Sequence, residues 1–357
     1  MKKLDRYILQ KFLSTFIFVV IILVLIICVI DFTEKNDDFI KNDVSNKLIR
    51  SYYLTFIPYI ASLLTPITVF IATVFITAKM AAKTEIIAIL ASGVSFRRMM
   101  LPYLIGGIII ALASFFLNSY VIPDANKFRI AFELEYLKKP FYYSDRDIHV
   151  KIGEDSYIYM DRYNNQSDQG YKVTLERIKE QKLYEKLSAT RIRWDTATSK
   201  WTLLDWQLRS IKNNTEVITN GDKIDTLLNL TPDDFDNKER LWETLTLGEL
   251  NDYIELQYSR GSEDVQIYLI EKYIRFMSPF TVLILMFIGV IVSAKKNRRG
   301  TGFQIAMGFL IAFVFIIFFI LARAIAEANS INPILAVWLP NIVFSVVGLV
   351  LYYTLPR

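Results

Sequence analysis

The sequence predicts an α-helical membrane protein with six transmembrane helices and a β-rich domain inserted between the third helix and the fourth. The first observation is that 53% of the 357 residues are hydrophobic. The second is that they gather in six blocks, each near or above the roughly 20 apolar residues that span a bilayer. The third is that the chain between the third and fourth blocks alternates apolar and polar residues, as β-strands do. The blocks are Phe12–Ile30, Leu54–Ala78, Leu101–Ile122, Phe276–Ala294, Phe303–Ala322 and Ile334–Tyr353.

Basic residues gather in the segments that the positive-inside rule assigns to the cytoplasm. The N-terminus, the loops after the second and fourth blocks and the last residue hold 13 basic residues and only two acidic ones, Asp5 and Glu85. The whole chain has a formal charge of +5, so the remainder is net negative. We therefore predict that both termini are cytoplasmic, and that the positive charge reflects membrane topology and not nucleic-acid binding. The basic residues after the fourth block are Lys295, Lys296, Arg298 and Arg299.

The predicted outer domain covers residues 123–275 and separates the helices within 1–122 from those within 276–357. Its first part, Asp124–Lys138, still has the pattern of a helix, whereas the chain from Asp145 onwards is typical of seven or more short antiparallel strands. Such strands form a sandwich, a jelly roll or an open β-fold, and an edge strand can accept a strand from a partner. The predicted strands are 147–152, 156–163, 171–178, 189–194, 200–204, 206–211 and 223–230.

Helices return near the end of this domain. Thr246 and Glu249 are spaced as a capping box, which starts a helix, and Gly261 is placed to end it. Glu263 and Asp264, after Ser262, then cap the helix that leads into the fourth crossing. We therefore predict that helices connect the outer domain to the third and fourth crossings.

The chain lacks the usual residues for catalysis. One cysteine, Cys28, and one histidine, His149, leave no ordinary triad or metal site. The nearest approach to a phosphate-binding loop, Gly300–Gly302, lacks the Gly-Lys-Ser/Thr ending that holds phosphates. Asp233 and Asp234 are more simply helix-cap acids than catalytic carboxylates. We therefore expect no enzyme activity and no cofactor in this chain.

Ionisable residues are scarce inside the predicted helices, which argues against an ion-coupled carrier and against an acid-lined cation channel. Arg323, near the outer end of the fifth helix, is the exception, and Glu327 follows one turn later. The two residues either form an ion pair at the interface or leave Arg323 facing an anionic lipid headgroup. The remaining Phe, Ile, Leu and Val side chains suit an apolar cargo, although lipid-facing helices have the same composition.

The loop Lys79–Arg98 contains a short predicted helix on the cytoplasmic side. Thr84 is placed to cap this helix, with Glu85 in its first turn. Its apolar stripe is Ile86, Ile89, Leu90 and Val94, and its small residues are Ala88, Ala91, Ser92 and Gly93. An acidic residue is unexpected in a helix that only rests on anionic headgroups. Because Glu85 fits better as the counter-charge for a partner's arginine or lysine, we predict that this helix docks a protein.

Several short motifs occur along the chain in a characteristic order. They are Leu4-Asp5-Arg6-Tyr7-Ile8, Pro66 in the second crossing, Thr84-Glu85 followed by Ala91-Ser92-Gly93, Asn229–Asp233, the helix pair at 247–259 and 264–275, and Ile331-Asn332-Pro333. With a β-domain between crossings three and four, this order resembles the LptF/LptG (YjgP/YjgQ) permeases, the membrane subunits of the lipopolysaccharide export ABC transporter. The resemblance covers essentially the whole chain.

The resemblance implies partners and a mechanism. A second, similar permease pairs with the chain, two copies of a cytoplasmic ATPase bind below it and use ATP and Mg²⁺, and periplasmic bridge proteins receive lipopolysaccharide at the edge of a β-jelly roll. The segment at about 83–95 is then the coupling helix, and the lateral gate uses the crossings at 12–30 and 303–322. The residues implied in ATPase coupling are Lys83, Thr84, Glu85, Ile86, Ile89, Leu90, Ser92 and Gly93.

One position departs from the family pattern. Some members carry a lysine near the outer end of the first crossing that faces lipid phosphates, whereas this chain has Asp31 there, with Lys35 and Lys41 nearby. The candidate headgroup residues are therefore Asp31, Lys35, Lys41 and Arg323. We predict an inner-membrane permease subunit, of either type in the family, that extracts lipopolysaccharide toward the outer membrane. The alternatives are a stand-alone lipid flippase or secondary carrier, and a membrane-anchored envelope scaffold.

Overall fold

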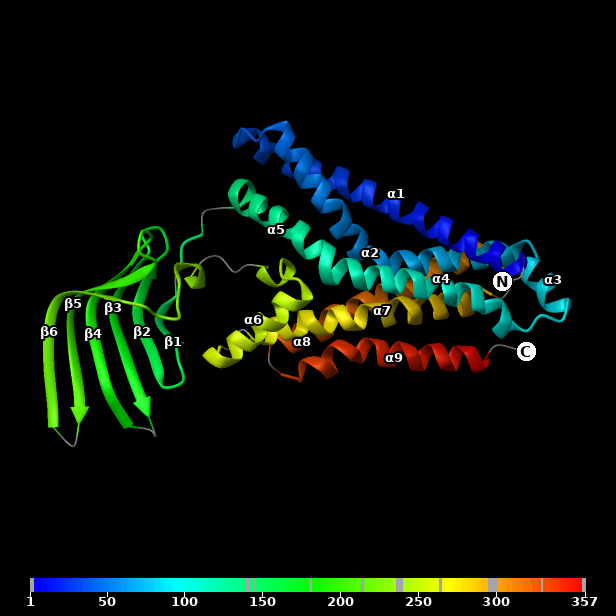
Figure 1. Cartoon of the computed structure of the whole chain (residues 1–357). Coiled ribbons are helices and arrows are strands. Elements are labelled where there is room, and N and C mark those ends of the chain that lie inside the picture. The colour runs from blue at the N-terminus through cyan, green and yellow to red at the C-terminus, as the bar shows by residue number, and fades with distance from the viewer. Residues whose placement is uncertain are drawn as a thin grey trace. The chain divides into compact units, whose positions relative to one another are not determined.

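The computed structural model describes residues 3–138, 141–143, 145–179, 182–212, 215–235, 240–262, 265–294, 301–328 and 330–354. The chain forms two compact units (Figure 1). The helical unit comprises Met1–Lys138, Trp242–Leu250 and Gln266–Arg357, and the sheet unit comprises Lys139–Leu241 and Asn251–Val265. The predicted basic loop at 295–299 and the predicted cap at Glu263–Asp264 lie outside the described residues, as do Asn213, Asn214 and Gly300.

Among the described residues, six helices are long and apolar enough to cross a membrane, as the sequence predicts. They are α1 (Lys3–Lys41), α2 (Asn46–Ala82), a composite helix over Phe96–Leu137, α7 (Val265–Ser293), α8 (Thr301–Glu327) and α9 (Pro333–Thr354). The composite helix consists of α4 (Phe96–Phe116), η1 (Leu117–Val121), α5 (Ile122–Phe132) and η2 (Glu133–Leu137), of which η1 and η2 are π-helical. The predicted extension of the third crossing beyond Asp124 is thereby confirmed.

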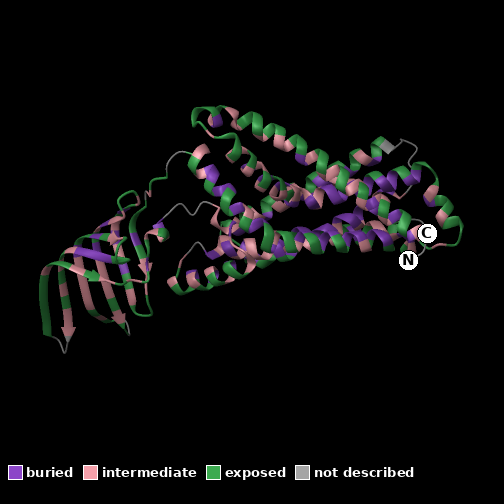
Figure 2. Cartoon of the chain, turned by 45° about the horizontal axis from the view of Figure 1, so that its top comes forward, coloured by how far each residue is buried: buried purple, intermediate pink, exposed green. Residues whose placement is uncertain are grey.

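The crossing helices differ in how far the rest of the helical unit covers them. In the most apolar stretch of α2, 61% of the residues are buried, against only 6% for α1 and 22% for α8. Figure 2 shows the buried positions running through the middle of the helical unit, while exposed positions dominate α1. Helices α1 and α8 therefore present most of their apolar side chains outwards, as expected of surfaces that face lipid or another helix.

The sheet unit contains one antiparallel sheet whose strands follow one another in chain order. The structure describes six strands instead of the predicted seven or more, because 200–204 and 206–211 form one continuous strand. Asp205, with φ of 51°, interrupts the alternation without ending the pairing on either side. The arrangement is the open sheet among the three that the sequence left open. The strands are β1 (Arg146–Lys151), β2 (Ser156–Asn164), β3 (Gln169–Lys179), β4 (Lys182–Asp195), β5 (Lys200–Lys212) and β6 (Thr215–Thr226).

The core of the sheet unit lies on one face of the strands. Ile158 and Met160, two residues apart in β2, are both buried there, as the two-residue period of a strand requires. The indole of Trp201 donates a 2.7 Å hydrogen bond to the carbonyl of Leu230, which attaches the chain after β6 to this face. Strand β6, in contrast, is exposed along most of its length and forms one edge of the described sheet.

The predicted capping box at the start of α6 (Leu247–Arg260) is confirmed. The amide of Glu249 donates to the hydroxyl of Thr246 (3.4 Å), and the amide of Thr246 donates to the Glu249 carboxylate (2.7 Å). Lys127 of α5 contacts the same carboxylate at 3.0 Å. Gly261, with φ of +67°, follows the last helical residue, as predicted.

We expect the capping box to make stability depend on acid pH. The hydrogen bond from the Thr246 amide, followed in effect by the contacts with Lys127, lowers the pKa of Glu249 below its ordinary value of 4.5. The stabilisation by the carboxylate is therefore complete above that value and is lost as the pH falls through the lower pKa of the folded state. Thermal unfolding between about pH 7 and about pH 3 should show Glu249→Gln to be destabilised near neutrality and equal to the parent chain in acid. Glu255→Gln, at an exposed position of α6, should match the parent throughout.

Candidate functional site

The predicted docking helix corresponds to α3, a helix of seven residues from Glu85 to Ala91. It is shorter than the predicted segment at 83–95, because Gly93 adopts a φ of +85° after it. Ser95 then caps the next helix, α4, by accepting a hydrogen bond from the amide of Arg98 (3.3 Å). The helix therefore lies between two turns, at the end of the helical unit where Figure 1 also places both chain termini. We call this the α3 end.

The prediction that Thr84 caps this helix through its side chain is wrong. Thr84 does occupy the position before α3, but in the left-handed conformation with φ of 60°. Its hydroxyl donates to the carbonyl of Lys83 (2.6 Å) and makes no hydrogen bond with an amide of α3. Thr84 is thus part of the tight turn after α2, and its side chain does not cap α3.

The side chains of α3 divide between the core and the surface. Ile86 is 3% exposed and packs in the hydrophobic core at the α3 end, with Ile89 against the same core. Ile87 is 52% exposed and Leu90 is 39% exposed. The predicted stripe therefore contains two residues that anchor α3, whereas its outward apolar surface is formed by Leu90 together with Ile87. Lys83, Thr84, Ser92 and Gly93 are exposed beside this surface.

Glu85 has partners within the chain, and both come from α1. One carboxylate oxygen accepts a hydrogen bond from the hydroxyl of Tyr7 (3.0 Å) and forms an ion pair with Lys11 (3.4 Å). The ammonium of Lys11 also contacts the Tyr7 hydroxyl and lies over its ring. The Glu85 side chain keeps about a quarter of its surface exposed. A cationic group of another protein therefore has access to a carboxylate that the first crossing already holds in place.

A second ion pair fixes the start of α1 near α3. Asp5, which is almost fully buried, accepts two hydrogen bonds of 2.7 Å from the guanidinium of Arg98. This bidentate geometry is the most specific that arginine and a carboxylate form. The neighbouring Arg97 donates to the hydroxyl of Tyr352 in α9 (2.9 Å). Two of the basic residues that indicated topology therefore also join α4 to α1 and α9.

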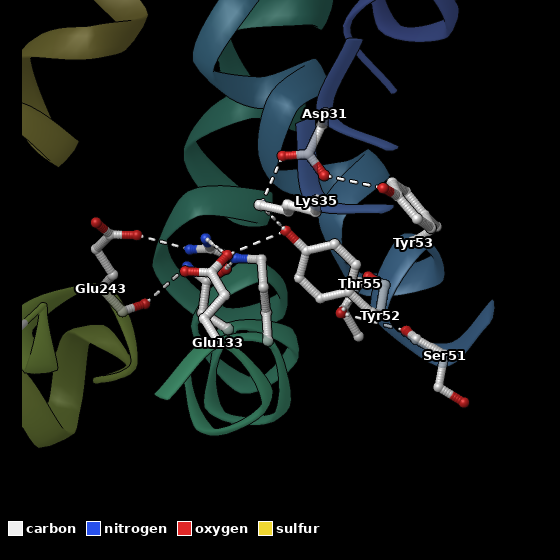
Figure 3. Close-up of polar contacts among 10 residues, drawn as sticks. Asp31, Lys35, Ser51, Tyr52, Tyr53, Thr55, Glu133 and Glu243 are labelled. Atoms are coloured by element: carbon white, nitrogen blue, oxygen red, sulfur yellow. Dashed lines mark hydrogen bonds and ion pairs between the residues drawn. The ribbon is translucent and has the colours of Figure 1, made fainter. Parts of the chain in front are cut away.

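The candidate headgroup residues Asp31 and Lys35 lie together (Figure 3), near the end of α1 that is opposite α3 and the chain termini (Figure 1). We call this end of the helical unit the Asp31 end. Lys35 forms an ion pair with Asp31 (2.6 Å) and a hydrogen bond with the hydroxyl of Tyr52 (2.5 Å). Tyr53 donates to the second oxygen of Asp31 (3.0 Å). The lysine ammonium is thus already surrounded by one carboxylate and a phenol, and about a quarter of its side chain is exposed.

The other two candidate headgroup residues have local partners. Arg323 forms an ion pair with Glu327 at 2.8 Å, one helical turn later in α8. Lys41 lies 3.9 Å from Asp38 and is mostly exposed. Of the two alternatives for Arg323, the structure contains the pair with Glu327, and the arginine remains one-third exposed.

The sequence reasoning missed a buried charged group next to Lys35. Tyr52 donates to Glu133 (3.1 Å), Glu133 contacts Arg129 (3.2 Å), and Arg129 contacts Glu243 (2.7 Å). Arg129 is 1% exposed. The spacing of Arg129 and Glu133, four residues apart in a predicted helix, was a signal for an ion pair. No local pattern points to Tyr52 or Glu243, which come from distant parts of the chain.

Almost the whole chain matches a family model. A family model described as lipopolysaccharide export system permease LptF/LptG matches residues 6–354. A search of curated proteins gives no match. The match begins within the Asp5–Ile8 region of α1 and ends at the last residue of α9, so it includes α3, the Asp31 end and the whole sheet unit.

Proposed function

This chain belongs to the LptF/LptG family of lipopolysaccharide export permeases, and we propose that it extracts lipopolysaccharide from the inner membrane as one subunit of an ABC transporter. A second permease of the same family completes the lipid pathway, and two copies of a separate cytoplasmic ATPase supply the energy. Both termini and α3 face the cytoplasm, and the sheet unit lies in the periplasm. There it passes the lipid to a bridge that leads to the outer membrane.

The observation that carries this proposal is the way α3 is built. Its outward surface, Ile87 and Leu90, is apolar and exposed, whereas its inward residue Ile86 is locked into the core. An exposed apolar patch with polar groups at its rim marks an interaction site, and here Ile87 and Leu90 lie beside the partly exposed carboxylate of Glu85. Because the helix is anchored on one face and exposed on the other, a partner that binds it can displace the crossings to which it is attached.

The ion pair between Glu85 and Lys11 gives that displacement a direct route to α1. An ATPase with a cationic residue at its surface would share or replace Lys11 as the partner of Glu85. Either event changes the contact between α3 and the first crossing, which is the least covered helix of the unit. We propose that α1 and α8 form the lateral gate, since both expose continuous apolar side chains along their length. In this proposal a movement of the ATPase displaces α3, α3 displaces α1, and α1 acts on the lipid at the gate.

We expect Glu85→Lys to weaken recovery of the ATPase with the detergent-solubilised chain by more than about tenfold, because like charges would face each other at the interface. Co-purification of the two proteins, followed by mass spectrometry of the intact complex, measures this. The swapped double variant Lys11→Glu/Glu85→Lys restores the intrachain ion pair but not the acid on α3. If Glu85 docks the ATPase, the swap remains defective, whereas recovery in the swap would show that Glu85 only positions α3.

Two further outcomes would overturn the proposal. If the Glu85→Lys chain assembled and extracted lipopolysaccharide normally, α3 would not be the docking helix. If the parent chain purified alone, without an ATPase or a second permease, the flippase and scaffold alternatives would replace the ABC permease. Photo-crosslinkers along 12–30 and 303–322 test the gate separately, since lipopolysaccharide should label these segments before it labels α9.

A further inference from the structure

A continuous series of polar contacts crosses the Asp31 end of the helical unit (Figure 3). It joins α1, α2 and the α5–η2 helix to the segment Trp242–Leu250, which we call the Glu243 segment. This segment belongs to the helical unit but is covalently continuous with the sheet unit on both sides. The contacts therefore link the first crossing to the stretch of chain from which the sheet unit extends. The members in order are Asp31, Lys35, Tyr52, Glu133, Arg129 and Glu243.

Tyr52 is the junction of this series. Its hydroxyl accepts a hydrogen bond from Lys35 of α1 (2.5 Å) and donates one to Glu133 (3.1 Å). The tyrosine is fully buried, and its ring stacks on Phe132 with centroids 4.9 Å apart. A phenol hydroxyl can accept and donate at the same time, so a single oxygen connects α1 to the charged pair on α5–η2.

Arg129 carries the connection to the Glu243 segment. Its guanidinium contacts Glu133 (3.2 Å) and Glu243 (2.7 Å), and it lies over the ring of Tyr59 at 3.9 Å. The carbonyl of Glu243 also accepts a hydrogen bond from the side chain of Asn126 (3.0 Å). Two groups on α5 therefore hold the same residue, one through its side chain and one through its backbone.

Arg275 of α7 holds the Glu243 segment from another side. Its guanidinium donates to the carbonyls of Leu245 (2.7 Å) and Trp242 (2.9 Å). Arg275 is 4% exposed, so these contacts are shielded from water. Two buried arginines thus bind the segment, one from α5 and one from α7, and a shift of Arg129 changes one of these contacts.

The charges of these residues explain why a displacement of one member displaces the next. The series contains three carboxylates and only two cations; its three central members, Tyr52, Glu133 and Arg129, are buried, and the others are half-buried. In a medium of low polarity a buried charge that loses its partner is strongly destabilised, so neighbouring groups follow it rather than separate. The end at Lys35 is the most accessible part, and it belongs to the crossing helix that is least covered. A movement of α1 therefore displaces Lys35 first, and the other members of the series after it.

We propose that Tyr52, Glu133 and Arg129 are positioning residues that transmit the position of α1 to the Glu243 segment. Under the proposed function, on which the biological role of this link rests, lipid entry past α1 would alter the Glu243 segment before the lipid reaches the sheet unit. The link itself is a property of one chain. Its test is therefore independent of the ATPase and of the gate.

Amide hydrogen exchange of the Glu243 segment, in the purified full-length chain, reports on this link. The amides of Thr246, Glu249 and Leu250 donate hydrogen bonds, so their exchange is slow enough to follow. Lys35→Met, on α1, should accelerate their exchange by roughly fivefold or more, the usual lower range for coupled sites. Lys41→Met removes an ammonium from the same helix outside the series and should leave these rates unchanged.

Tyr52→Phe provides the decisive variant, because it removes one oxygen and keeps the buried ring. It should accelerate exchange in the Glu243 segment as Lys35→Met does, and the double variant should show no further acceleration. Tyr53→Phe removes a hydroxyl that, among the described residues, donates to Asp31 at the far end of the series, and it should leave the Glu243 segment unaffected. The inference is overturned if the segment exchanges normally in Tyr52→Phe, or if the effects of Tyr52→Phe and Lys35→Met multiply as independent changes. In either case the proposed export function would be untouched.

Discussion

Replacing Arg129 with methionine should lower the free energy of unfolding by about 3–5 kcal/mol, because removing one partner of a buried ion pair leaves uncompensated charge. Two carboxylates, those of Glu133 and Glu243, contact this guanidinium. Methionine keeps much of the side-chain volume, so the loss reports on charge more than on a cavity. The effect is measured by heating the purified chain to a series of temperatures and recording, at each one, the fraction of the protein that stays monodisperse.

Lys127→Met is the matched control for this prediction. Lys127 precedes Arg129 by two residues in α5 and also forms two ion pairs, with Asp124 and Glu249, but its side chain is about half exposed. Exposed ion pairs contribute roughly 0–1 kcal/mol, so the loss should stay within that range. Adding Glu133→Gln and Glu243→Gln to Arg129→Met should recover most of the stability. Equal losses for the two single variants would contradict the assignment of Arg129 as a buried charge.

A large side chain at Gly106 should displace α1 from α4. A Cβ atom at this position would lie 2.7 Å from the ring of Phe12 and 3.0 Å from Leu9, both on α1. Phe12 is fully buried, so its ring has little room to move away. Overpacking of this kind costs about 1–3 kcal/mol and shifts the backbone. We expect Gly106→Leu to lower the unfolding temperature and, if α1 is a gate helix, to abolish lipid export.

The control for this substitution is Gly302→Leu. Gly302 also lies in a crossing helix, α8, but a Cβ atom there would have no neighbour within 4 Å. Gly302→Leu should therefore leave the unfolding temperature of the chain unchanged. A disulfide or crosslink between α1 and α4, placed beside Gly106, would show directly whether the two helices separate. Normal crosslinking in Gly106→Leu would mean that the helices absorb the side chain without moving.

Most of the fold was predictable from the sequence because its largest determinants are local. A stretch of about 20 apolar residues must cross a membrane as a helix, whatever surrounds it, since its backbone has no other hydrogen-bond partners there. The capping box at Thr246–Glu249 is likewise set by residues three positions apart. The strand prediction failed where tertiary pairing overrode a local sequence rule. Asp205 looked like the end of a strand, yet pairing with β4 and β6 continues on both sides of it.

The candidate site could be predicted only in part. The sequence located α3 and Glu85, because an acidic residue in a basic loop is visible without a structure. It assigned the capping of α3 to Thr84, whose backbone instead forms a left-handed turn. The sequence also indicated Lys35 as a headgroup residue. It did not reveal that the Lys35 ammonium contacts Asp31 and Tyr52. The role of α3 in coupling and that of Lys35 toward lipid remain predictions.

By itself, then, the sequence determined that this chain has six helices long and apolar enough to cross a membrane, with a sheet inserted between the third and the fourth. These properties follow from composition and from spacings of a few residues. Only the tertiary structure decided the charge partners, because helix packing brings together residues far apart in the chain. Lys11 meets Glu85 across 74 positions, Tyr52 meets Glu133 across 81, and Arg129 meets Glu243 across 114. Helix α3 is therefore joined to α1, and α1 to the Glu243 segment, by contacts that no local pattern encodes.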